Sequence, residues 1–349
     1  MPSPKPTPNI LIVRLGLLGD MVCTTPMLEA IKKHFPEGRL CLLSNEYNKP
    51  VVTRNPYIDK LYTYVHAKGR ERNPRPGFFA SLIDAWKLRR DLKREHFDWI
   101  VVCNGGFNKP SVRIAQTLGG KIISATREDS SYEYRVDFPI SGLLEPVEHE
   151  IVRTFRLLSP LGIVMEELPQ HLTLSAAPER VAAIENAFPR TPGKHLRLGV
   201  HISASEAARQ WPISAFAQLI NTIANAHPDV EILVFYGHSQ EANRNALATE
   251  LLNPVTFVPP SNIDDLIASL ALCDLLLCND GGVLHLAAGL GIPIVGLFEG
   301  NPMKYDCWYP WGVPYFSVSA PNGTSVAVIE PTVVTKAVTQ LINQLSEKL

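Results

Sequence analysis

The sequence predicts an α/β protein made of two consecutive, doubly wound α/β domains. Short, continuous apolar runs alternate with helical patterns along the chain, as expected for strands buried on both faces of a parallel sheet. The alternation restarts after a Pro- and Ala-rich stretch near residues 168–177. The length of 349 residues agrees with about two domains of roughly 150 residues each.

The first half is expected to begin with a strand over residues 9–13, a Gly-containing turn and one helix over residues 20–35. Further strands are expected at 40–43, 99–103 and 121–124. Further helices are expected at 48–54, 77–95 and 112–118. We assign residues 1–170 to this N-terminal domain.

The second half, residues 171–349, is expected to form the C-terminal domain. Its expected strands cover 196–200, 231–235, 275–278 and 293–298. Its expected helices cover 212–226, 238–252, 263–271, 283–290 and 331–348, and we allow the last helix to pack back on the first domain. Ligands of open α/β sheets bind at the carboxyl ends of the strands, so the loops that follow strands are where a site is sought.

Composition excludes several classes of protein. The net charge of −1 excludes a globally basic nucleic-acid-binding protein, and 46% hydrophobic residues exclude intrinsic disorder. No uninterrupted apolar segment reaches the ~20 residues of a membrane span. The first apolar run, residues 10–13, is followed at once by Arg14, unlike a signal peptide. The six cysteines form no CxxC pair and lie mostly in apolar runs, so we expect buried free thiols in a cytoplasmic protein.

The loop after the first expected strand contains Gly16, Gly19 and Asp20. The glycines allow a tight turn that brings the backbone close to a ligand. Asp20 stands at the start of a helix, where its carboxylate either caps backbone amides or faces a ligand. The spacing is neither the dinucleotide fingerprint nor a P-loop.

The loop after the first strand of the second half places Ser203, Ser205 and Arg209 just before a helix that begins with Pro212. Hydroxyls, loop amides and a guanidinium can together hold a diphosphate. The alternative is an ordinary capped loop with a surface arginine. Trp211 is expected to pack this loop on the core.

A third loop, Asn279-Asp280-Gly281-Gly282, ends a buried strand and enters a helix. The amides of Gly281, Gly282 and Val283 at that helix start form an expected anion site. His285 on the first turn is either a buried core residue or a donor ligand. No second His or Cys at suitable spacing completes a metal site.

These segments together resemble glycosyltransferase family 9, the ADP-heptose:lipopolysaccharide heptosyltransferase family. The resemblance is carried by residues 10–26, 209–212, 279–288 and 291–298, and by His149-Glu150-Ile151-Val152-Arg153 before the domain linker. It spans roughly residues 9–310, and the order and spacing of the motifs make it specific.

The resemblance implies a GT-B fold, with two Rossmann-like domains facing across a cleft. It implies that the N-terminal domain, residues 1–170, binds the acceptor and that the C-terminal domain, residues 171–349, binds the nucleotide sugar. It implies an inverting transfer of heptose, or a related sugar, from an ADP-activated donor to a lipopolysaccharide-core or similar anionic saccharide, with no metal and no other cofactor. By position, Asp20 matches the catalytic base. The residues implied to bind the donor are Ser203, Ser205, Arg209, Asp280, Gly281, Gly282, Val283 and His285.

Three positions depart from the family pattern. Gly281 stands where Ser or Thr is common after the loop aspartate, and Gln210 stands where a second basic residue is common. The usual Phe-Gly-Pro-Thr turn is replaced by residues 298–302. These differences leave the fold unaffected and bear on the donor sugar and on activity.

Local charge favours an anionic acceptor. Nine basic and four acidic residues lie between Lys68 and Glu95, interleaved with aromatic and aliphatic residues. Such a segment suits a phosphorylated lipid or saccharide at the cytoplasmic face of the inner membrane. The alternative is an amphipathic helix with a solvated basic face. The residues we expect to bind the acceptor are Gly19, Arg70, Arg72, Arg89 and Arg90.

Other functions stay open. The chain could use a UDP- or GDP-sugar, act as a nucleotide-sugar epimerase of the same architecture, or be a catalytically silent nucleotide-sugar-binding homologue. An NAD dehydrogenase lacks its fingerprint here, and no motif indicates nucleic-acid binding. We expect a peripheral membrane protein that is a monomer.

Overall fold

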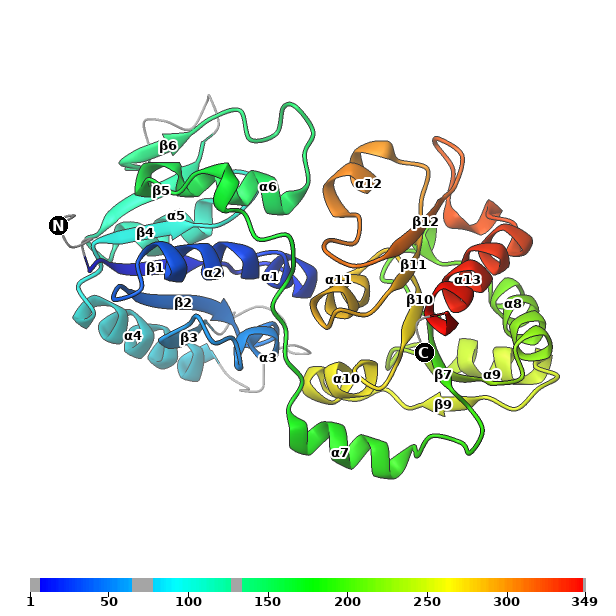
Figure 1. Cartoon of the computed structure of the whole chain (residues 1–349). Coiled ribbons are helices and arrows are strands. Elements are labelled where there is room, and N and C mark those ends of the chain that lie inside the picture. Colours follow the sequence, from blue (N-terminus) through cyan, green and yellow to red (C-terminus); the bar gives the residue numbers. More distant parts are fainter. Residues whose placement is uncertain (1–6, 65–77, 127–133, 348–349) are drawn as a thin grey trace. The chain divides into compact units, whose positions relative to one another are not determined.

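The computed structural model describes residues 7–64, 78–126 and 134–347 (Figure 1). The chain divides into two compact units, Met1–Thr173 and Leu174–Leu349. The sequence placed the division at residues 170 and 171.

Unit 1 is built on a six-stranded parallel sheet with the order β3-β2-β1-β4-β5-β6. Its strands are β1 (Asn9–Val13), β2 (Arg39–Asn45), β3 (Lys60–Tyr64), β4 (Trp99–Val102), β5 (Lys121–Ala125) and β6 (Phe138–Ile140). The middle strands are apolar on both faces because helices cover both. Helices α4 (Phe78–Arg94) and α5 (Lys109–Gln116) bury Leu92 and Val112 against Leu11 and Leu43.

The helix expected over residues 20–35 is two helices, α1 (Leu18–Val22) and α2 (Thr25–His34). The single-helix prediction was wrong because local side chains interrupt the backbone pattern. The hydroxyl of Thr24 donates to the carbonyl of Asp20, and that of Thr25 donates to Val22. Pro26 lacks an amide proton and stands in the first turn of α2, where a proline is tolerated.

The remaining helices of unit 1 are short. They are α3 (Lys49–Val52), α6 (Glu150–Phe155) and the 3₁₀ turns η1 (Arg156–Leu161) and η2 (Met165–Glu167). Helix α6 packs against α2. The carboxylate of its first residue, Glu150, will prove central to the site.

Unit 2 repeats the architecture with the order β12-β11-β10-β7-β8-β9, again parallel throughout. Its strands are β7 (Leu196–His201), β8 (Val230–Phe235), β9 (Thr256–Val258), β10 (Leu275–Asn279), β11 (Ile294–Phe298) and β12 (Tyr315–Ser319). Numbered within each unit, both sheets have the order 3-2-1-4-5-6 of a Rossmann sheet. The predicted doubly wound α/β class is confirmed in both halves.

The helices of unit 2 surround this sheet. They are α7 (Pro178–Ala187), α8 (Ile213–Ala226), α9 (Glu241–Glu250), α10 (Ile263–Leu270), α11 (Gly282–Gly289), α12 (Pro302–Trp308) and α13 (Pro331–Ser346), with 3₁₀ turns η3 (Ala207–Arg209) and η4 (Val326–Val328). The last helix, which we allowed to pack on the first domain, buries Val334, Val338 and Leu341 in unit 2's own core. That core also contains Trp211 and Phe216, so the expected packing of Trp211 is confirmed.

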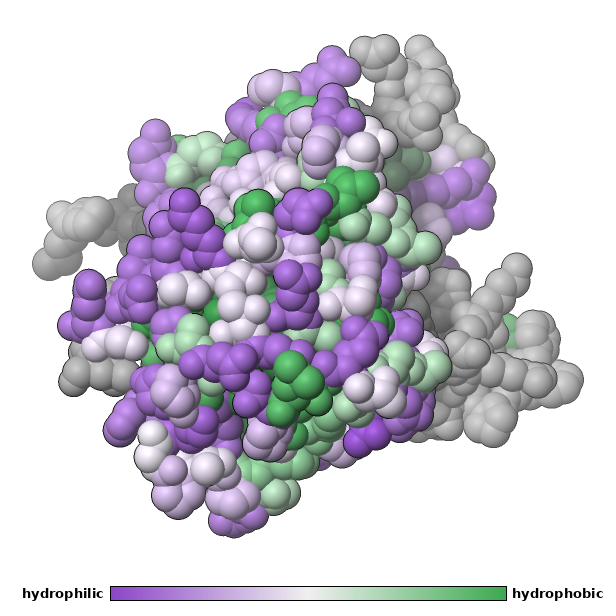
Figure 2. All heavy atoms as spheres, turned by 90° about the vertical axis from the view of Figure 1, so that its right-hand side faces the viewer, coloured by the Kyte–Doolittle hydropathy of each residue, from purple (hydrophilic) through white to green (hydrophobic). Residues whose placement is uncertain are grey.

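The surface of unit 2 that carries α8, α9 and α13 shows apolar residues in small groups among hydrophilic ones (Figure 2). All six cysteines are buried and none forms a disulfide, as predicted. Among the described residues, no helix is both long enough and apolar enough to span a bilayer.

Candidate active site

The unusual loops of the sequence lie where the strand order reverses. In unit 1 this point is between β1 and β4, and in unit 2 it is between β7 and β10. Loops that leave the carboxyl ends of strands there are the usual ligand-binding segments of open α/β sheets. The three predicted loops follow β1, β7 and β10, so all three stand at these points. The sequence did not single out the fourth loop, which begins at Cys103 after β4.

Asp20 lies on the short helix α1, directly after the carboxyl end of β1. Its Oδ2 accepts a hydrogen bond of 2.7 Å from the backbone amide of Leu17. Its Oδ1 lies 3.4 Å from Nη2 of Arg14, and its side chain is 24% exposed. The carboxylate is therefore held in place and is still open to solvent.

Gly16 makes room for that carboxylate. A Cβ at this position would lie 2.1 Å from Oδ2 and 2.8 Å from Cβ of Asp20, so the Asp20 side chain would have to leave this position. The Gly16 carbonyl is fixed by the side-chain amides of Asn45, at 2.8 Å, and Asn48, at 3.0 Å. Gly16 is thus required by close approach to Asp20, and Gly19, an expected acceptor residue, lies buried beside Asp20 in α1.

A buried ionic network supports Asp20, and its roles were not predicted. Arg14 is 2% exposed and donates to Oε1 of Glu150 at 2.8 Å and to the carbonyl of Cys103. Glu150 also accepts from the Gly105 amide at 3.2 Å and from Arg153 at 2.6 Å. Arg14 therefore links the Asp20 loop to the loop after β4 and to α6.

The network holds a permanent positive charge next to Asp20. Burial alone would lower the pKa of Arg14, but the charges of Glu150 and Asp20 outweigh it and raise that pKa. Gly105 is needed here as Gly16 is needed at Asp20, because a Cβ at Gly105 would lie 2.1 Å from Oε2 of Glu150. Arg14 and Glu150 lie in segments that carry the family resemblance. Their burial could not be predicted, because a charged residue next to an apolar run is usually exposed.

In unit 2, side-chain clips shape the loop after β7. The Ser203 hydroxyl accepts from the Gly237 amide at 2.9 Å and ties this loop to the one after β8. Gln210 accepts from the Ala204 amide at 3.1 Å and donates to the carbonyls of Ile202 and Trp211 at 2.8 and 2.9 Å. Gln210, where the sequence departs from the family pattern, therefore stabilises the loop through its side-chain hydrogen bonds. Ser205 lies exposed in the same loop.

Arg209 and Asp280 meet across the point where the strand order of unit 2 reverses. Nη1 of Arg209 lies 3.5 Å from Oδ2 of Asp280, while its Nη2 binds Glu206 at 2.5 Å. Asp280 is 8% exposed. Burial raises the pKa of Asp280, and the nearby charges of Arg209 and Lys304 oppose that rise. The predicted cation and acid of the donor half are thus brought together.

Helix α11 begins beside this pair. Gly281 is its N-cap, with extended backbone, and the amides of the first turn have no partner within the helix. They present a partial positive charge next to Arg209. His285 is 2% exposed and packs edge-on against Trp308 at 5.6 Å, so packing accounts for this side chain and its role as a donor ligand stays a prediction.

Two further charged residues stand near Asp280. Lys304 on α12 forms an ion pair with Glu299, which follows β11. Both charges act on Asp280. In the sequence, the altered turn at residues 298–302 is the feature that points to Glu299 and Lys304. Gly300 in that turn is required, because a Cβ there would lie 1.9 Å from the Pro321 carbonyl oxygen.

Comparison with known proteins decides the family. The model of glycosyltransferase family 9 (heptosyltransferase) matches residues 85–335. The chain belongs to glycosyltransferase family 9. It is 22% identical over 302 residues to lipopolysaccharide heptosyltransferase 3 of Escherichia coli, a match that covers 84% of this chain and 83% of that protein.

Solved structures agree with this family fold. A glycosyl transferase family 9 protein from Veillonella parvula has a TM-score of 0.82 at 19% identity, covering 97% of both chains. The E. coli ADP-heptose LPS heptosyltransferase II has a TM-score of 0.76 at 18% identity, covering 97% of this chain and 99% of that one. The family 9 protein is thus a glycosyltransferase with the two Rossmann-like units of the GT-B fold.

The expected acceptor residues of this glycosyltransferase are placed unevenly. Arg70 and Arg72 lie outside the described residues. Arg89 and Arg90 lie in the second half of α4. Directly after this helix, the carbonyl of Glu95 accepts a hydrogen bond from the side-chain amide of Asn9, the first residue of β1. The structure therefore sets these two arginines towards the amino ends of the strands, away from Asp20 at the carboxyl ends. Their role in acceptor binding stays a prediction.

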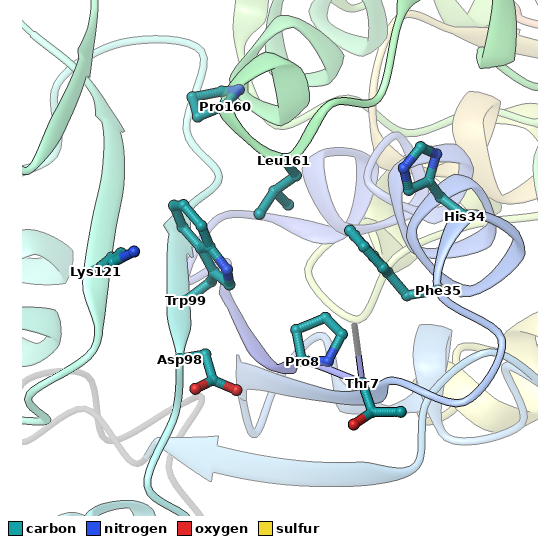
Figure 3. A pocket seen from close by; sticks show the side chains of 9 residues that line it. All are labelled: Thr7, Pro8, His34, Phe35, Asp98, Trp99, Lys121, Pro160 and Leu161. Carbon is teal, nitrogen blue, oxygen red and sulfur yellow. The ribbon is translucent and has the colours of Figure 1, made fainter. Parts of the chain in front are cut away.

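A pocket of about 600 Å³ also lies in unit 1 (Figure 3). It is at the amino ends of the strands, whereas Asp20 is at their carboxyl ends. Trp99 and Lys121, which line it, are the first residues of β4 and β5, and the Lys121 ammonium lies 4.9 Å from the Trp99 ring centre. This pocket is therefore separate from the loops of the family 9 site. Among the described residues, no three His, Cys, Asp or Glu side chains gather as a metal site would require.

We expect Asp280→Asn to stabilise the family 9 enzyme at neutral pH. The folded pKa of Asp280 is raised, so between the unfolded and folded values the native state binds more protons and stability falls as pH rises. At neutral pH the charged form therefore costs stability. A gain of roughly 1 kcal/mol would raise Tm by about 2–4 °C for a unit of this size.

Thermal unfolding at pH 7 and again in acid tests this, with Asp306→Asn on the exposed side of α12 as control. The gain should shrink as acid protonates wild-type Asp280. An unchanged Tm at pH 7, or an equal gain at both pH values, would contradict the expectation.

Proposed function

We propose that this glycosyltransferase transfers a heptose from an ADP-activated donor to an anionic, lipopolysaccharide-core saccharide. The observation that carries the proposal is the pair of charged sites at the strand-order reversals. Unit 1 carries a restrained, solvent-accessible carboxylate at Asp20, and unit 2 carries Arg209 beside the first turn of α11. The similarity to proteins named for ADP-heptose and lipopolysaccharide supports this donor and acceptor.

In the proposed reaction, Asp20 removes the proton from the acceptor hydroxyl while that oxygen attacks the anomeric carbon. The bond to the donor diphosphate breaks on the opposite face, so the anomeric configuration inverts. Arg14 stays cationic. Because Arg14 is also held by Glu150, it fixes the orientation of the Asp20 carboxylate. General-base help of this kind contributes typically about 10²–10⁴-fold.

The leaving diphosphate gains negative charge as the bond breaks. Arg209 and the amides of Gly281, Gly282 and Val283 are the groups proposed to receive it, with the Ser205 hydroxyl as a further donor. These donors are already oriented by the fold, which is what makes electrostatic stabilisation effective. With this charge carried by protein groups, we propose that the reaction needs no metal ion.

A donor panel tests the proposal directly. We expect ADP-heptose to raise Tm, by the equivalent of about 2.7 kcal/mol at a hundredfold excess over Kd, while GDP- and UDP-sugars do not. Turnover with ADP-heptose should survive EDTA, and NMR of the product should show an inverted anomeric centre. A selective shift by a UDP-sugar would overturn the donor, and ADP-heptose binding without transfer would favour a silent binding protein.

Gly281→Ser is expected to tighten donor binding. A Cβ at Gly281 meets nothing within 4 Å, and its extended backbone suits any residue. The added hydroxyl restores the group that the family commonly has there. A hydrogen bond to a charged phosphate is worth about 1.5 kcal/mol, or about tenfold in Kd for ADP.

Gly281→Ala is the matched control, because it fills the same space without a hydroxyl. Calorimetric titration with ADP should show a gain for the serine variant alone. An equal gain for alanine would assign the effect to packing or to a more rigid backbone, because alanine carries no hydroxyl.

We also propose that the enzyme acts in the cytoplasm at the inner face of the inner membrane, where an anionic lipid-linked saccharide would be reached. The support is the basic segment between Lys68 and Glu95, in which basic residues outnumber acidic ones by nine to four.

A further inference from the structure

Helix α4 combines exposed apolar side chains with clustered positive charge. Leu82, Ile83 and Trp86 are 51%, 54% and 61% exposed, which is unusual for large apolar side chains so close together. The helix carries five basic residues, Lys87, Arg89, Arg90, Lys93 and Arg94, against two acids, Asp84 and Asp91.

The two kinds of residue share one face of α4. At 3.6 residues per turn, positions 82, 86, 89 and 93 form one stripe, and positions 83, 87, 90 and 94 form the next. The opposite side packs on the sheet, where Leu92 is fully buried and Leu88 is half-buried. The acids lie at 84 and 91, on a third stripe. The outer face is therefore apolar in its first half and basic in its second.

Contacts on this face hold the arrangement together without hiding it. The Arg90 guanidinium lies 5.0 Å from the centre of the Trp86 ring, and Arg90 and Arg94 share Asp91 at 3.2 and 3.9 Å. All of these side chains stay at the surface, so such ion pairs contribute little to stability. Packing among the described residues gives no reason for three large exposed apolar side chains.

A groove of about 250 Å³ runs beside this face, between α4 and α5. Ala85, Leu88 and Ile114 are among its apolar lining residues, and Arg89 and Arg113 stand at it as well. Two guanidinium groups over an apolar groove suit a ligand with an anionic head and an apolar body.

We propose that the outer face of α4 docks the enzyme on an anionic lipid bilayer. Leu82, Ile83 and Trp86 insert at the interface, and Lys87, Arg89, Arg90, Lys93 and Arg94 contact lipid phosphates. Interfacial helices combine just these features, a basic polar face and aromatic or aliphatic anchors. The surface belongs to unit 1, where α4 lies beside β3 (Figure 1). Docking would bring the enzyme to a lipid-linked acceptor, so its biological role rests on the proposed function.

Flotation of the full-length protein with vesicles tests the docking. We expect the wild-type chain to float with phosphatidylcholine vesicles that contain phosphatidylglycerol, and to stay unbound with phosphatidylcholine alone or in high salt. One basic contact is worth about fivefold in partitioning, so Arg89→Glu with Arg90→Glu should lower binding at least about 25-fold. Trp86→Ser should also lower binding, and Trp86→Phe should restore most of it.

The matched control lies on α13, where Val333 is 51% exposed and Lys336 is exposed. Val333→Ser with Lys336→Glu removes an equally exposed apolar residue and a base, and it should leave vesicle binding unchanged. Transfer to a delipidated, soluble acceptor should be unaltered in the Trp86 variant. That readout separates loss of docking from failure of the proposed transferase activity.

Several results would overturn the docking surface. These are equal binding to neutral and anionic vesicles, or α4 variants that float like wild type. A wild-type chain that ignores vesicles but forms a dimer lost in Trp86→Ser would assign the face to a second copy instead.

Discussion

Asp20→Asn is expected to lower kcat by about 10²–10⁴-fold while the Kd for ADP stays unchanged. Asparagine has the shape of aspartate and its side-chain oxygen can still accept from the Leu17 amide. It cannot accept a proton from the acceptor at neutral pH. The donor residues belong to the separate fold of unit 2, so their geometry does not depend on residue 20.

The substitution should leave unit 1 folded. Arg14 keeps its bond of 2.8 Å to Glu150 when the Asp20 charge is removed, so no buried cation is stranded. Asp59→Asn is the matched control, since this acid lies before β3 at the amino edge of the same sheet and binds Lys32. Turnover and calorimetric titration of ADP check the prediction. Near wild-type kcat in Asp20→Asn on the true acceptor would remove Asp20 from its role as the base.

Position in the sheet decided which strands the sequence predicted. The expected strands correspond to β1, β2, β4, β5, β7, β8, β10 and β11, which are all interior. The strands it missed, β3, β6, β9 and β12, are the edges of the two sheets. Interior strands are buried on both faces and read as continuous apolar runs. Edge strands such as Phe138–Ile140 and Tyr315–Ser319 are only partly buried, so their sequences lack that run.

The site shows the same contrast between local and long-range information. Gly16, Asp20, Asp280 and Gly281 were found because a glycine or acid directly after an apolar strand is a local signal. The partners of Arg14 were not, because Glu150 lies 136 residues away in sequence and meets Arg14 only through the packing of α6. The Gln210 clip was missed for a different reason: its hydrogen bonds are local, but they depend on a loop conformation that residue types alone do not define.

Arg209→Ala is the second large effect, expected to lower kcat/KM by about 10²–10³-fold and to weaken ADP binding as well. Arg209 forms an ion pair with Asp280, the residue directly before the N-cap of α11. Its loss removes a proposed diphosphate contact. It also leaves Asp280 with less compensation for burial, so the pKa of Asp280 should rise further and its charge become more costly.

Two variants separate charge from geometry at this position. Arg209→Lys keeps the positive charge without the guanidinium geometry, and it should recover most of the ADP affinity. Glu206→Gln removes the exposed partner, whose carboxylate lies 2.5 Å from Nη2, and it should change kinetics little because Arg209 stays beside Asp280. Steady-state kinetics and ADP titration on the three variants order them. Wild-type ADP binding and turnover in Arg209→Ala would contradict this role. Other groups would then have to receive the negative charge of the leaving group. Lys304 would be the first candidate, because its charge also acts on Asp280.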